Sequence, residues 1–322
     1  MKAIVARNFA PLDALEYADW PEPVAGPRDI VIDAEAIGVN YPDGLLVQGL
    51  YQLRPPVPFV PGMEIAGKVT AVGAEVKGFK VGDRAAAVST LGAYAERAAV
   101  AEASAMKLPA GMSAADATAL MCGYGTAHHA LKQRAALKAG ETLVVLGASG
   151  LTGLAAVQIG KIMGARVIAV ASSDAKRAIA RAAGADEVVG YDNLKDDLKS
   201  LTGGKGVDVA FDPVGGDAFD ALSRSMARGG RLLIVGFASG TIPKFPVNLA
   251  LVKEFSLVGV FWGNFTKAEP KVYADNMREL VGWYQAGKVK PMIEGSYRLA
   301  EAPAVLRRIM GRGASGKLVL VP

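Results

Sequence analysis

Three hydrogen-bonding side chains stand close together early in the chain, inside an apolar run. Asn40, Tyr41 and Asp43 fall within the segment GVNYPDG, residues 38–44, and Pro42 stiffens the turn that we expect there. An amide, a phenol and a carboxylate donate and accept hydrogen bonds, but the amide and the phenol are weak nucleophiles and poor metal ligands. The segment therefore predicts a site that orients a bound molecule through hydrogen bonds.

A second segment has the glycine spacing of a phosphate-binding turn. Gly147, Gly150 and Gly153 follow an apolar run and precede a helical pattern at 151–164. Glycines in this order allow a tight turn and let the backbone approach a pyrophosphate at the helix N-terminus, where free N–H groups favour anions. We therefore expect a dinucleotide here rather than a plain glycine-rich turn. The candidate contacts in between are Ser149, Leu151 and Thr152.

The end of the next predicted strand bears on the choice of cofactor. An NAD site usually has Asp or Glu at this point to bind the ribose 2′-OH. Here Ser172 and Ser173 end the strand, and Lys176 and Arg177 follow one turn into the helix. These types suit a 2′-phosphate and favour NADPH, although the two cations would also suit an exposed helix face. Asp174 is expected to cap the helix.

Two later strands end in glycine-containing loops, 211–216 and 235–240. Ligand crevices in parallel sheets form outside the carboxyl ends of strands, so residues of these loops are further cofactor candidates. The candidates are Val214, Gly236, Phe237 and Ala238.

The elements that must position these residues fall into two classes. The first third has short alternating strands at 1–6, 29–39, 63–73, 83–89 and 94–100, separated by Pro- and Gly-rich turns, as in a β-barrel or sandwich. A helical pattern capped by Ser113 follows at 113–137. Apolar strands then alternate with helices up to residue 262, which predicts an α/β fold with a doubly wound parallel sheet.

Composition narrows the class of protein. The chain has 322 residues, 51% of them apolar, and a net charge of +5 without a cluster of Lys and Arg, which argues against nucleic-acid binding. Cys122 is the single cysteine, as expected in a reducing compartment. No apolar run approaches the ~18 residues of a membrane span. We therefore expect a cytoplasmic protein.

Together these segments resemble the medium-chain dehydrogenase/reductase superfamily. The resemblance rests on GVNYPDGLLVQGLY, VPGMEIAGKVTAVGAEVKGFKVGDRA, GYGTAHHAL and the glycine motif, and covers essentially the whole chain. It is strongest to the zinc-independent NADPH:quinone oxidoreductase branch. This resemblance implies a GroES-like catalytic domain, residues 1–117 and 263–322, and a Rossmann NADPH-binding domain, residues 118–262.

The zinc-containing members differ from this chain at the ligand positions. They have Cys where Asn40 stands and His where Met63 stands, which leaves Glu64 without ligand partners. Because a catalytic zinc needs about three protein ligands, we expect no metal. A substrate reduced without a Lewis acid must itself be electrophilic, such as a quinone or an activated alkene.

The resemblance also implies roles for particular residues. Asn40 lies near the nicotinamide in this family, and Asn40, Asp43 and Tyr51 are the candidates to orient the substrate, with structural roles in the loop as the alternative. Further positions match cofactor contacts of the family: Thr126, Tyr191 at the adenosine 2′-phosphate, and Phe261 with Trp262. The last two would otherwise be core residues.

The resemblance further implies a homodimer. The apolar segment 255–263 is similar to the edge strand that pairs across the dimer in this family. The alternative is a monomer in which the C-terminal helices bury this strand. Two other functions stay open on the same scaffold. One is an enoyl or acrylyl reductase, and the other is a non-catalytic NADPH-binding protein of the crystallin or RNA-binding kind.

Overall fold

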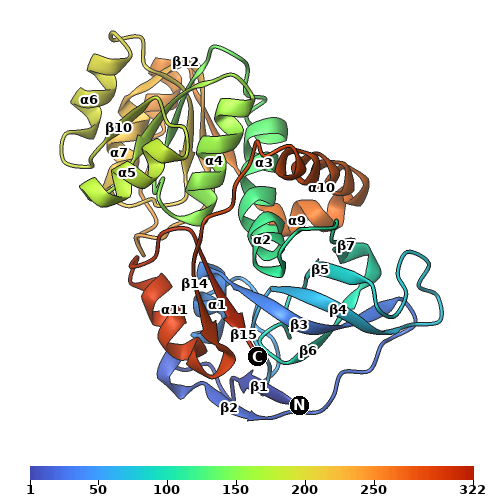
Figure 1. Cartoon of the computed structure of the whole chain (residues 1–322). Helices are drawn as coiled ribbons and strands as arrows, with labels where there is room; N and C mark the ends of the chain where they lie inside the picture. The colour runs from blue at the N-terminus through green and yellow to red at the C-terminus, as the bar shows by residue number, and fades with distance from the viewer. The chain divides into compact units, whose positions relative to one another are not determined.

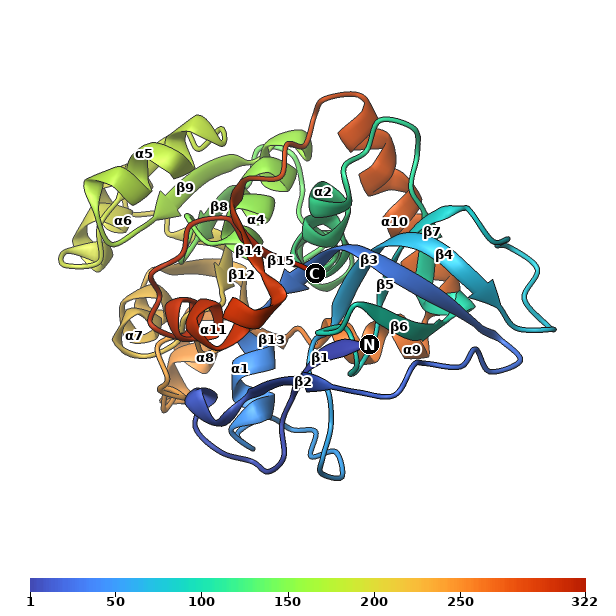
Figure 2. The same cartoon turned by 60° about the horizontal axis from the view of Figure 1, so that its bottom comes forward.

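The computed structural model describes all residues, 1–322, and the chain forms two compact units. The first combines Met1–Cys122 with Pro291–Pro322, and the second is Gly123–Lys290 (Figures 1 and 2). The first unit thus contains both chain ends. Residues 263–290, which we assigned to the first domain, belong to the second unit instead.

Aromatic contacts explain this difference. Phe265 stacks on the ring of His129, with 3.8 Å between ring centroids, and Tyr273 meets the edge of Trp262 at 5.9 Å. These contacts join the helices α9 (Trp262–Ala268) and α10 (Pro270–Gln285) to α3 (Gly125–His129). The apolar faces of α9 and α10 are therefore buried within the second unit.

The first unit is built on a seven-stranded sheet in which the order is β14-β15-β3-β4-β5-β7, with β6 paired to β3. All neighbouring pairs are antiparallel except β14 and β15. The strands are β3 (Asp29–Val39), β4 (Glu64–Val72), β5 (Arg84–Val88), β6 (Arg97–Ala101), β7 (Ala105–Lys107), β14 (Ile293–Arg298) and β15 (Lys317–Val321). A separate pair joins β1 (Lys2–Val5) and β2 (Glu16–Asp19). Our sequence analysis missed β2, β7 and β14.

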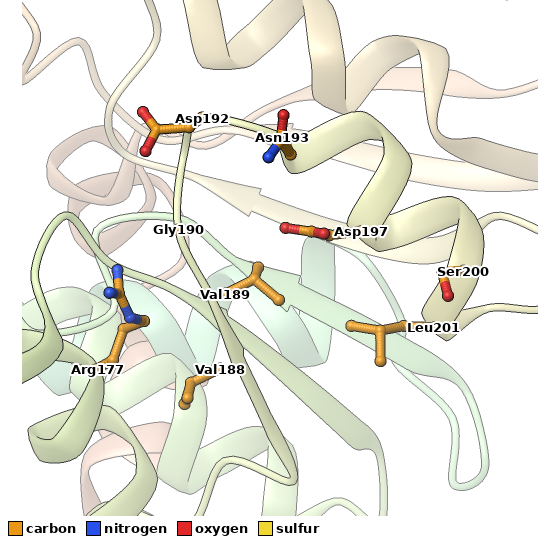
Figure 3. A pocket seen from close by; sticks show the side chains of 9 residues that line it. All are labelled: Arg177, Val188, Val189, Gly190, Asp192, Asn193, Asp197, Ser200 and Leu201. Atoms are coloured by element: carbon orange, nitrogen blue, oxygen red, sulfur yellow. The ribbon is translucent and has the colours of Figure 1, made fainter.

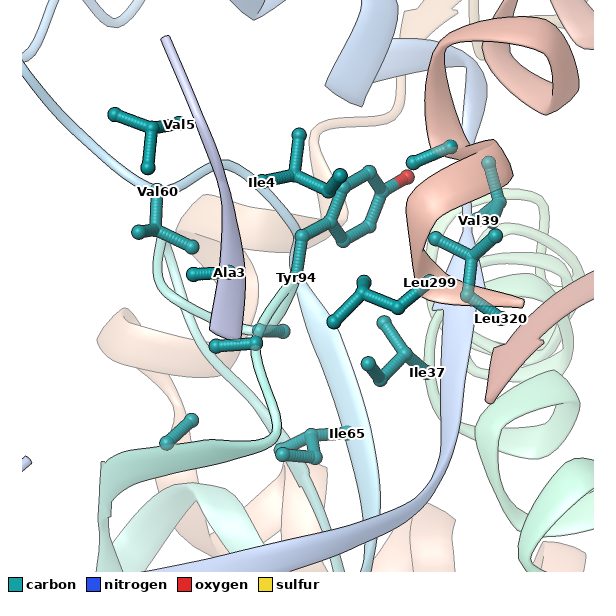
Figure 4. Close-up of a cluster of buried hydrophobic side chains, with 14 of the residues drawn as sticks. Ala3, Ile4, Val5, Ile37, Val39, Val60, Ile65, Tyr94, Leu299 and Leu320 are labelled. Atoms are coloured by element: carbon teal, nitrogen blue, oxygen red, sulfur yellow. The ribbon is translucent and has the colours of Figure 1, made fainter. Parts of the chain in front are cut away.

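Alternating apolar residues of these strands face one core. Ile30 and Ile32 of β3 are both fully buried, as are Ile4 of β1 and Ile65 of β4. Figure 4 shows the ring of Tyr94 among Ile4, Ile37 and Leu299 in this core. The helices of the unit are α1 (Tyr41–Val47), α2 (Ala114–Ala119) and α11 (Ala302–Met310). Ser113 caps α2 by accepting a hydrogen bond from the N–H of Asp116 at 3.0 Å, as predicted.

The second unit contains the predicted doubly wound sheet. Its six strands are all parallel in the order β10-β9-β8-β11-β12-β13. They are β8 (Thr142–Val145), β9 (Arg166–Val170), β10 (Glu187–Val189), β11 (Val207–Asp212), β12 (Met226–Ile234) and β13 (Ser256–Gly259). The order reverses between β8 and β11, and such a switch point is where sheets of this kind bind ligands.

Helices cover both faces of this sheet, which is why its strands are apolar throughout. One face packs on α4 (Leu151–Ile162) and α5 (Asp174–Ala182). The other buries apolar side chains of α6 (Leu194–Leu201) and α7 (Asp217–Arg224), including Leu198 and Phe219.

Four predicted segments differ in detail. The turn at 38–44 is the start of α1, and the helix at 113–137 is divided, since π-helical turns at Leu120–Tyr124 and Ala130–Arg134 flank α3. Within the βα series, the sequence pattern of a helix runs over 217–230, but α7 ends at Arg224, because Met226 already pairs with Val207 in the sheet. The Pro-rich loop before β13 contains α8 (Asn248–Lys253).

Candidate functional site

The first unit gathers polar side chains where β3 ends and α1 begins. Asn40 is the residue before α1, and its backbone N–H donates to Oδ2 of Asp43 at 2.8 Å. The same oxygen accepts a hydrogen bond from the hydroxyl of Tyr94 at 2.9 Å. This arrangement satisfies an N–H at the helix start, so the local sequence Asn-x-x-Asp fixes the turn into α1.

Asp43 is buried, with 1% of its surface exposed, and its other oxygen, Oδ1, has no hydrogen-bond partner. Burial raises the pKa of Asp43 to about 7, although the N–H of Asn40 and the hydroxyl of Tyr94 oppose that rise. The carboxyl group therefore exchanges a proton near neutral pH. This is the titration range that a proton donor or acceptor in catalysis requires.

The amide of Asn40 joins a second set of contacts. Its Nδ2 donates to Oε2 of Glu64 at 2.8 Å, and its Oδ1 accepts from Nζ of Lys317 at 2.9 Å. Lys317 and Glu64 also form a direct ion pair, and Oε1 of Glu64 accepts from the N–H of Cys122 at 2.7 Å. Sequence reasoning left Glu64 without partners and missed Lys317 altogether. The structure shows instead that Glu64 is bound by three groups.

Tyr51 lies beside this cluster, half-buried, and packs against the core of the first unit. Burial raises the pKa of its hydroxyl, and the nearby thiol of Cys122 and the carboxyl of Asp43 add to that rise. The structure thus brings the predicted trio of Asn40, Asp43 and Tyr51 into one neighbourhood. The described residues contain no group of three or more His, Cys, Asp or Glu side chains arranged to hold a metal ion.

The second unit contains the glycine loop between β8 and α4. Gly150 is the residue before α4, and no side chain caps this helix, whereas Ser173 caps α5. A methyl group added at Gly153 would lie 2.3 Å from the carbonyl oxygen of Gly147, so glycine is needed there for the helix to approach the loop. One added at Gly150 would meet only that oxygen, at 3.5 Å, and otherwise open space.

These features fit a bound pyrophosphate. The first turn of α4, which contains Leu151, Thr152 and Gly153, points uncapped N–H groups out of a twelve-residue helix. The open space over Gly150 leaves room for an anion to approach them. Ser149 is buried within the same loop. The predicted loop residues therefore lie together at the start of α4.

The end of β10 contributes Tyr191 to this loop. The Tyr191 hydroxyl accepts a hydrogen bond from the backbone N–H of Gly147 at 2.9 Å. Tyr191 therefore lies beside the glycine turn, where a residue at the adenosine end of a cofactor is expected.

The end of β9 differs from our expectation in which residue caps α5. Ser173 is the cap, since its hydroxyl accepts a hydrogen bond from the N–H of Lys176 at 3.3 Å, and Asp174 begins the helix. Arg177 donates to the carbonyl of Ala171 and pairs with Asp174 at 2.6 Å. Ser172 is exposed. Lys176 lies in the first turn of α5 and stays our candidate cation for a 2′-phosphate.

The loops after β11 and β12 hold each other in place. Asp212, buried at the end of β11, accepts hydrogen bonds from the N–H groups of Val214 and Gly215, each at 2.8 Å. Backbone bonds of 3.0 Å and 2.9 Å then join Pro213 to Ala238 and Val214 to Ser239. The candidates Val214, Gly236, Phe237 and Ala238 are thereby brought together. Sequence reasoning missed Asp212, which sets the shape of this loop.

The remaining candidates of the second unit have different environments. Thr126 is partly exposed on α3, and Phe261 is 58% exposed. Trp262 is buried instead, and its indole packs 2.9 Å from the position that a methyl group on Gly125 would occupy. Trp262 therefore has the surroundings of a core residue, which was the alternative to a cofactor contact.

A cavity of about 450 Å³ lies along β10, beside α6 (Figure 3). Its wall includes Arg177, Gly190, Asp192, Asp197 and Ser200. Of the residues considered for the cofactor, only Arg177 lines it, and we assign the cavity no ligand.

Comparison with known proteins identifies the family. Residues 26–110 match the model of the alcohol dehydrogenase GroES-like domain, and residues 152–281 match that of the zinc-binding dehydrogenases. Quinone oxidoreductase-like protein 2 of Rattus norvegicus is 38% identical over 321 residues, which cover 99% of this chain and 91% of the relative. The chain belongs to the medium-chain dehydrogenase/reductase superfamily.

Solved structures of the superfamily agree with this fold. A mycobacterial protein complexed with NADPH is 31% identical, with a TM-score of 0.95 and full coverage of both chains. Escherichia coli quinone oxidoreductase complexed with NADPH is 27% identical, with a TM-score of 0.93 and full coverage of both. The chain is accordingly an oxidoreductase with a GroES-like and a Rossmann part, like its quinone oxidoreductase relatives.

The zinc-ligand positions of the superfamily lie outside the region that matches the zinc-binding dehydrogenase model. The model described as a zinc-binding dehydrogenase covers residues 152–281, which begin in α4 and end in α10. The zinc-ligand positions that our sequence analysis compared, Asn40, Met63 and Glu64, fall in the GroES-like match instead. Glu64 there is bound by Lys317, Asn40 and the N–H of Cys122.

No helix of the chain combines the length and apolar character of a membrane span.

Proposed function

We propose that this oxidoreductase uses NADPH to reduce quinones by hydride transfer, without a metal ion. The observation that carries the proposal is the amide of Asn40, held by an ion pair where related enzymes would have a metal ligand. A hydrogen-bond donor of this kind stabilises charge that develops on a carbonyl oxygen of an electrophilic acceptor. It is a weaker substitute for a Lewis acid in alcohol oxidation.

Each unit contributes a different part of this chemistry. NADPH, when bound, supplies the hydride. The uncapped N-terminus of α4 and the open space over Gly150 would hold its pyrophosphate, while Lys176, Ser172 and Tyr191 would hold its 2′-phosphate. Asn40 orients the acceptor, and the one proton that together with the hydride completes the hydroquinone comes from the Tyr51 hydroxyl or from water. Asp43, which titrates near neutral pH, supports that proton transfer.

We further propose that the chain acts as a homodimer in the cytoplasm. The strand β13 ends the sheet, and its residues are largely exposed. Exposed apolar side chains lie before, within and after it in the sequence; they are Ile242, Val247, Leu251 and Val252 before it, Leu257 within it and Phe261 after it. Pairing of β13 with its own copy would cover these groups and remove two open edges. The free Cys122 is consistent with a reducing compartment.

A panel of acceptors tests the proposed function. Oxidation of NADPH would be followed with simple quinones, with enones and with enoyl thioesters under the same conditions. We expect turnover to be fastest with quinones. Faster turnover with enones or thioesters would reassign the chain to alkene reduction. NADPH binding without turnover of any acceptor would support a non-catalytic role.

A further inference from the structure

The ion pair between Glu64 and Lys317 is buried almost completely. The exposed fractions of the two side chains are 0% and 1%. Glu64 begins β4 and Lys317 begins β15, and β3 lies between these strands in the sheet. Gly38 of β3 makes the contact possible, because a methyl group there would lie 2.2 Å from Oε2 of Glu64 and 2.8 Å from Cε of Lys317.

A contribution to folding stability does not by itself explain why this ion pair is buried. Removing two charges from water is costly, and apolar residues of similar size often stabilise a core as well or better. The pair is nevertheless well supplied with further contacts, since Glu64 also accepts from the N–H of Cys122 and from the amide of Asn40. What these contacts have in common is that they define the position of the Asn40 side chain.

The pair allows only one orientation of the Asn40 amide. Oδ1 must face the ammonium of Lys317, and Nδ2 must face the carboxylate of Glu64. With the amide reversed, its N–H groups would face the ammonium of Lys317 and its oxygen would face the carboxylate of Glu64, and both contacts would be repulsive. One N–H of Nδ2 then remains for another partner, and Asn40 is only partly buried. An ammonium on the oxygen side also polarises the amide and strengthens that remaining donor.

We propose that Lys317 and Glu64 are positioning residues that fix and polarise the Asn40 amide, so that its remaining N–H donates to the substrate oxygen as hydride arrives. This inference rests on the proposed function. The ion pair includes Glu64 and holds Asn40, two of the positions where zinc-containing relatives have metal ligands. The positive charge of Lys317 acts on the substrate through the Asn40 amide, and the ion pair does not itself bind the substrate.

The test compares two neutralised ion pairs. The double variant Glu64→Gln/Lys317→Met removes both charges together, so no lone buried charge is left to unfold the chain. The control, Glu141→Gln/Arg231→Met, removes a pair in the second unit that is bonded at 2.7 Å and 3.0 Å and is about four-fifths buried. We expect the first to lower kcat with a quinone about tenfold or more, with KM for NADPH unchanged, and the control to leave kcat as it was.

A second measurement does not depend on catalysis. The side-chain amide protons of Asn40, assigned by their loss in Asn40→Asp, should exchange slowly with solvent in the natural protein and in the control. They should exchange fast in Glu64→Gln/Lys317→Met. A folded double variant with natural kcat and slow amide exchange would overturn the inference. If the natural protein reduces no acceptor, the proposed function fails, but the exchange rates still decide whether the pair fixes the amide.

Discussion

The hydroxyl of Tyr191 accepts a hydrogen bond from the backbone N–H of Gly147 at 2.9 Å, which ties the end of β10 to the glycine loop. Two roles for Tyr191 follow, a contact to the 2′-phosphate or a support for the loop, and Tyr191→Phe separates them. A contact to the 2′-phosphate predicts that NADPH binds about tenfold more weakly while NADH is unaffected. Equal weakening of both cofactors in a fluorescence titration would assign Tyr191 to the loop alone.

Lys176 provides a test of cofactor choice that is independent of the loop. Lys176→Ala should raise KM for NADPH about tenfold or more and spare NADH, because hydrogen bonds to a charged group contribute about 1.5–3 kcal/mol. Arg181→Ala removes the same charge from the exposed end of the same helix and serves as control. Equal use of NADPH and NADH by the natural protein would refute the 2′-phosphate assignment.

The glycine loop predicts opposite outcomes for two alanine substitutions. Gly150→Ala fits the fold, so the free energy of unfolding should change by no more than about 1 kcal/mol, while NADPH binding weakens because the methyl group enters the anion space. Gly153→Ala should instead destabilise the chain by roughly 1–3 kcal/mol, since its methyl group meets backbone atoms. Denaturant unfolding and NADPH titration of both variants check this. Unchanged NADPH affinity in Gly150→Ala would argue against a pyrophosphate there.

Asp43 predicts a pH dependence of stability. Its pKa is raised from an ordinary 3.8 to about 7 in the folded chain, so the proton is bound more tightly when folded. The stability that this proton contributes is complete below the unfolded pKa and is lost as pH rises through the folded pKa, at about 1.4 kcal/mol per pH unit in between. Asp43→Asn removes this dependence.

The measurement is the unfolding free energy of the natural chain and of Asp43→Asn across the pH range. Relative to the natural chain, Asp43→Asn should gain stability between about pH 4 and pH 7 and change little above that. A difference that is constant with pH would mean that Asp43 ionises normally despite its burial.

The dimer proposal can be tested at the exposed edge of β13. Val260 donates its N–H to Ile234 of β12, so alternate residues, including Val258, face β12, and Leu257 faces the open edge. Leu257→Pro should therefore remove an outward N–H without breaking the sheet and should yield a folded monomer. Light scattering at micromolar concentration checks both proteins. A natural chain that is already monomeric would rule the dimer out.

The sequence alone predicts the βα series well, because each strand and helix is marked by local apolar periodicity. The same holds for the glycine loop and for the cap at Ser113. Prediction from the sequence fails where two interacting residues are distant in the chain. Lys317 stands at the start of the apolar segment KLVLV, and its partner Glu64 lies 253 residues earlier. Only the pairing of β15 and β4 with β3 brings the two charges together.

Local signals were also misjudged at two positions. The segment Asn40–Asp43 has the spacing of a helix start, and Pro42 is favoured in a first turn, so α1 could have been predicted in place of a turn. The error in the domain boundary at residue 262 could not have been avoided from the sequence. The side chains that bind α9 and α10 to the second unit, such as His129 and Phe265, show no local pattern.

The most direct test of the account is a single-turnover reaction of the chelator-treated chain with NADPH and a simple quinone, followed by the loss of the reduced nicotinamide absorbance. We predict oxidation of one NADPH for each quinone, at the same rate before and after chelation, and more slowly with NADH. No oxidation of NADPH by any quinone, or a rate that falls on chelation and returns with added zinc, would contradict it.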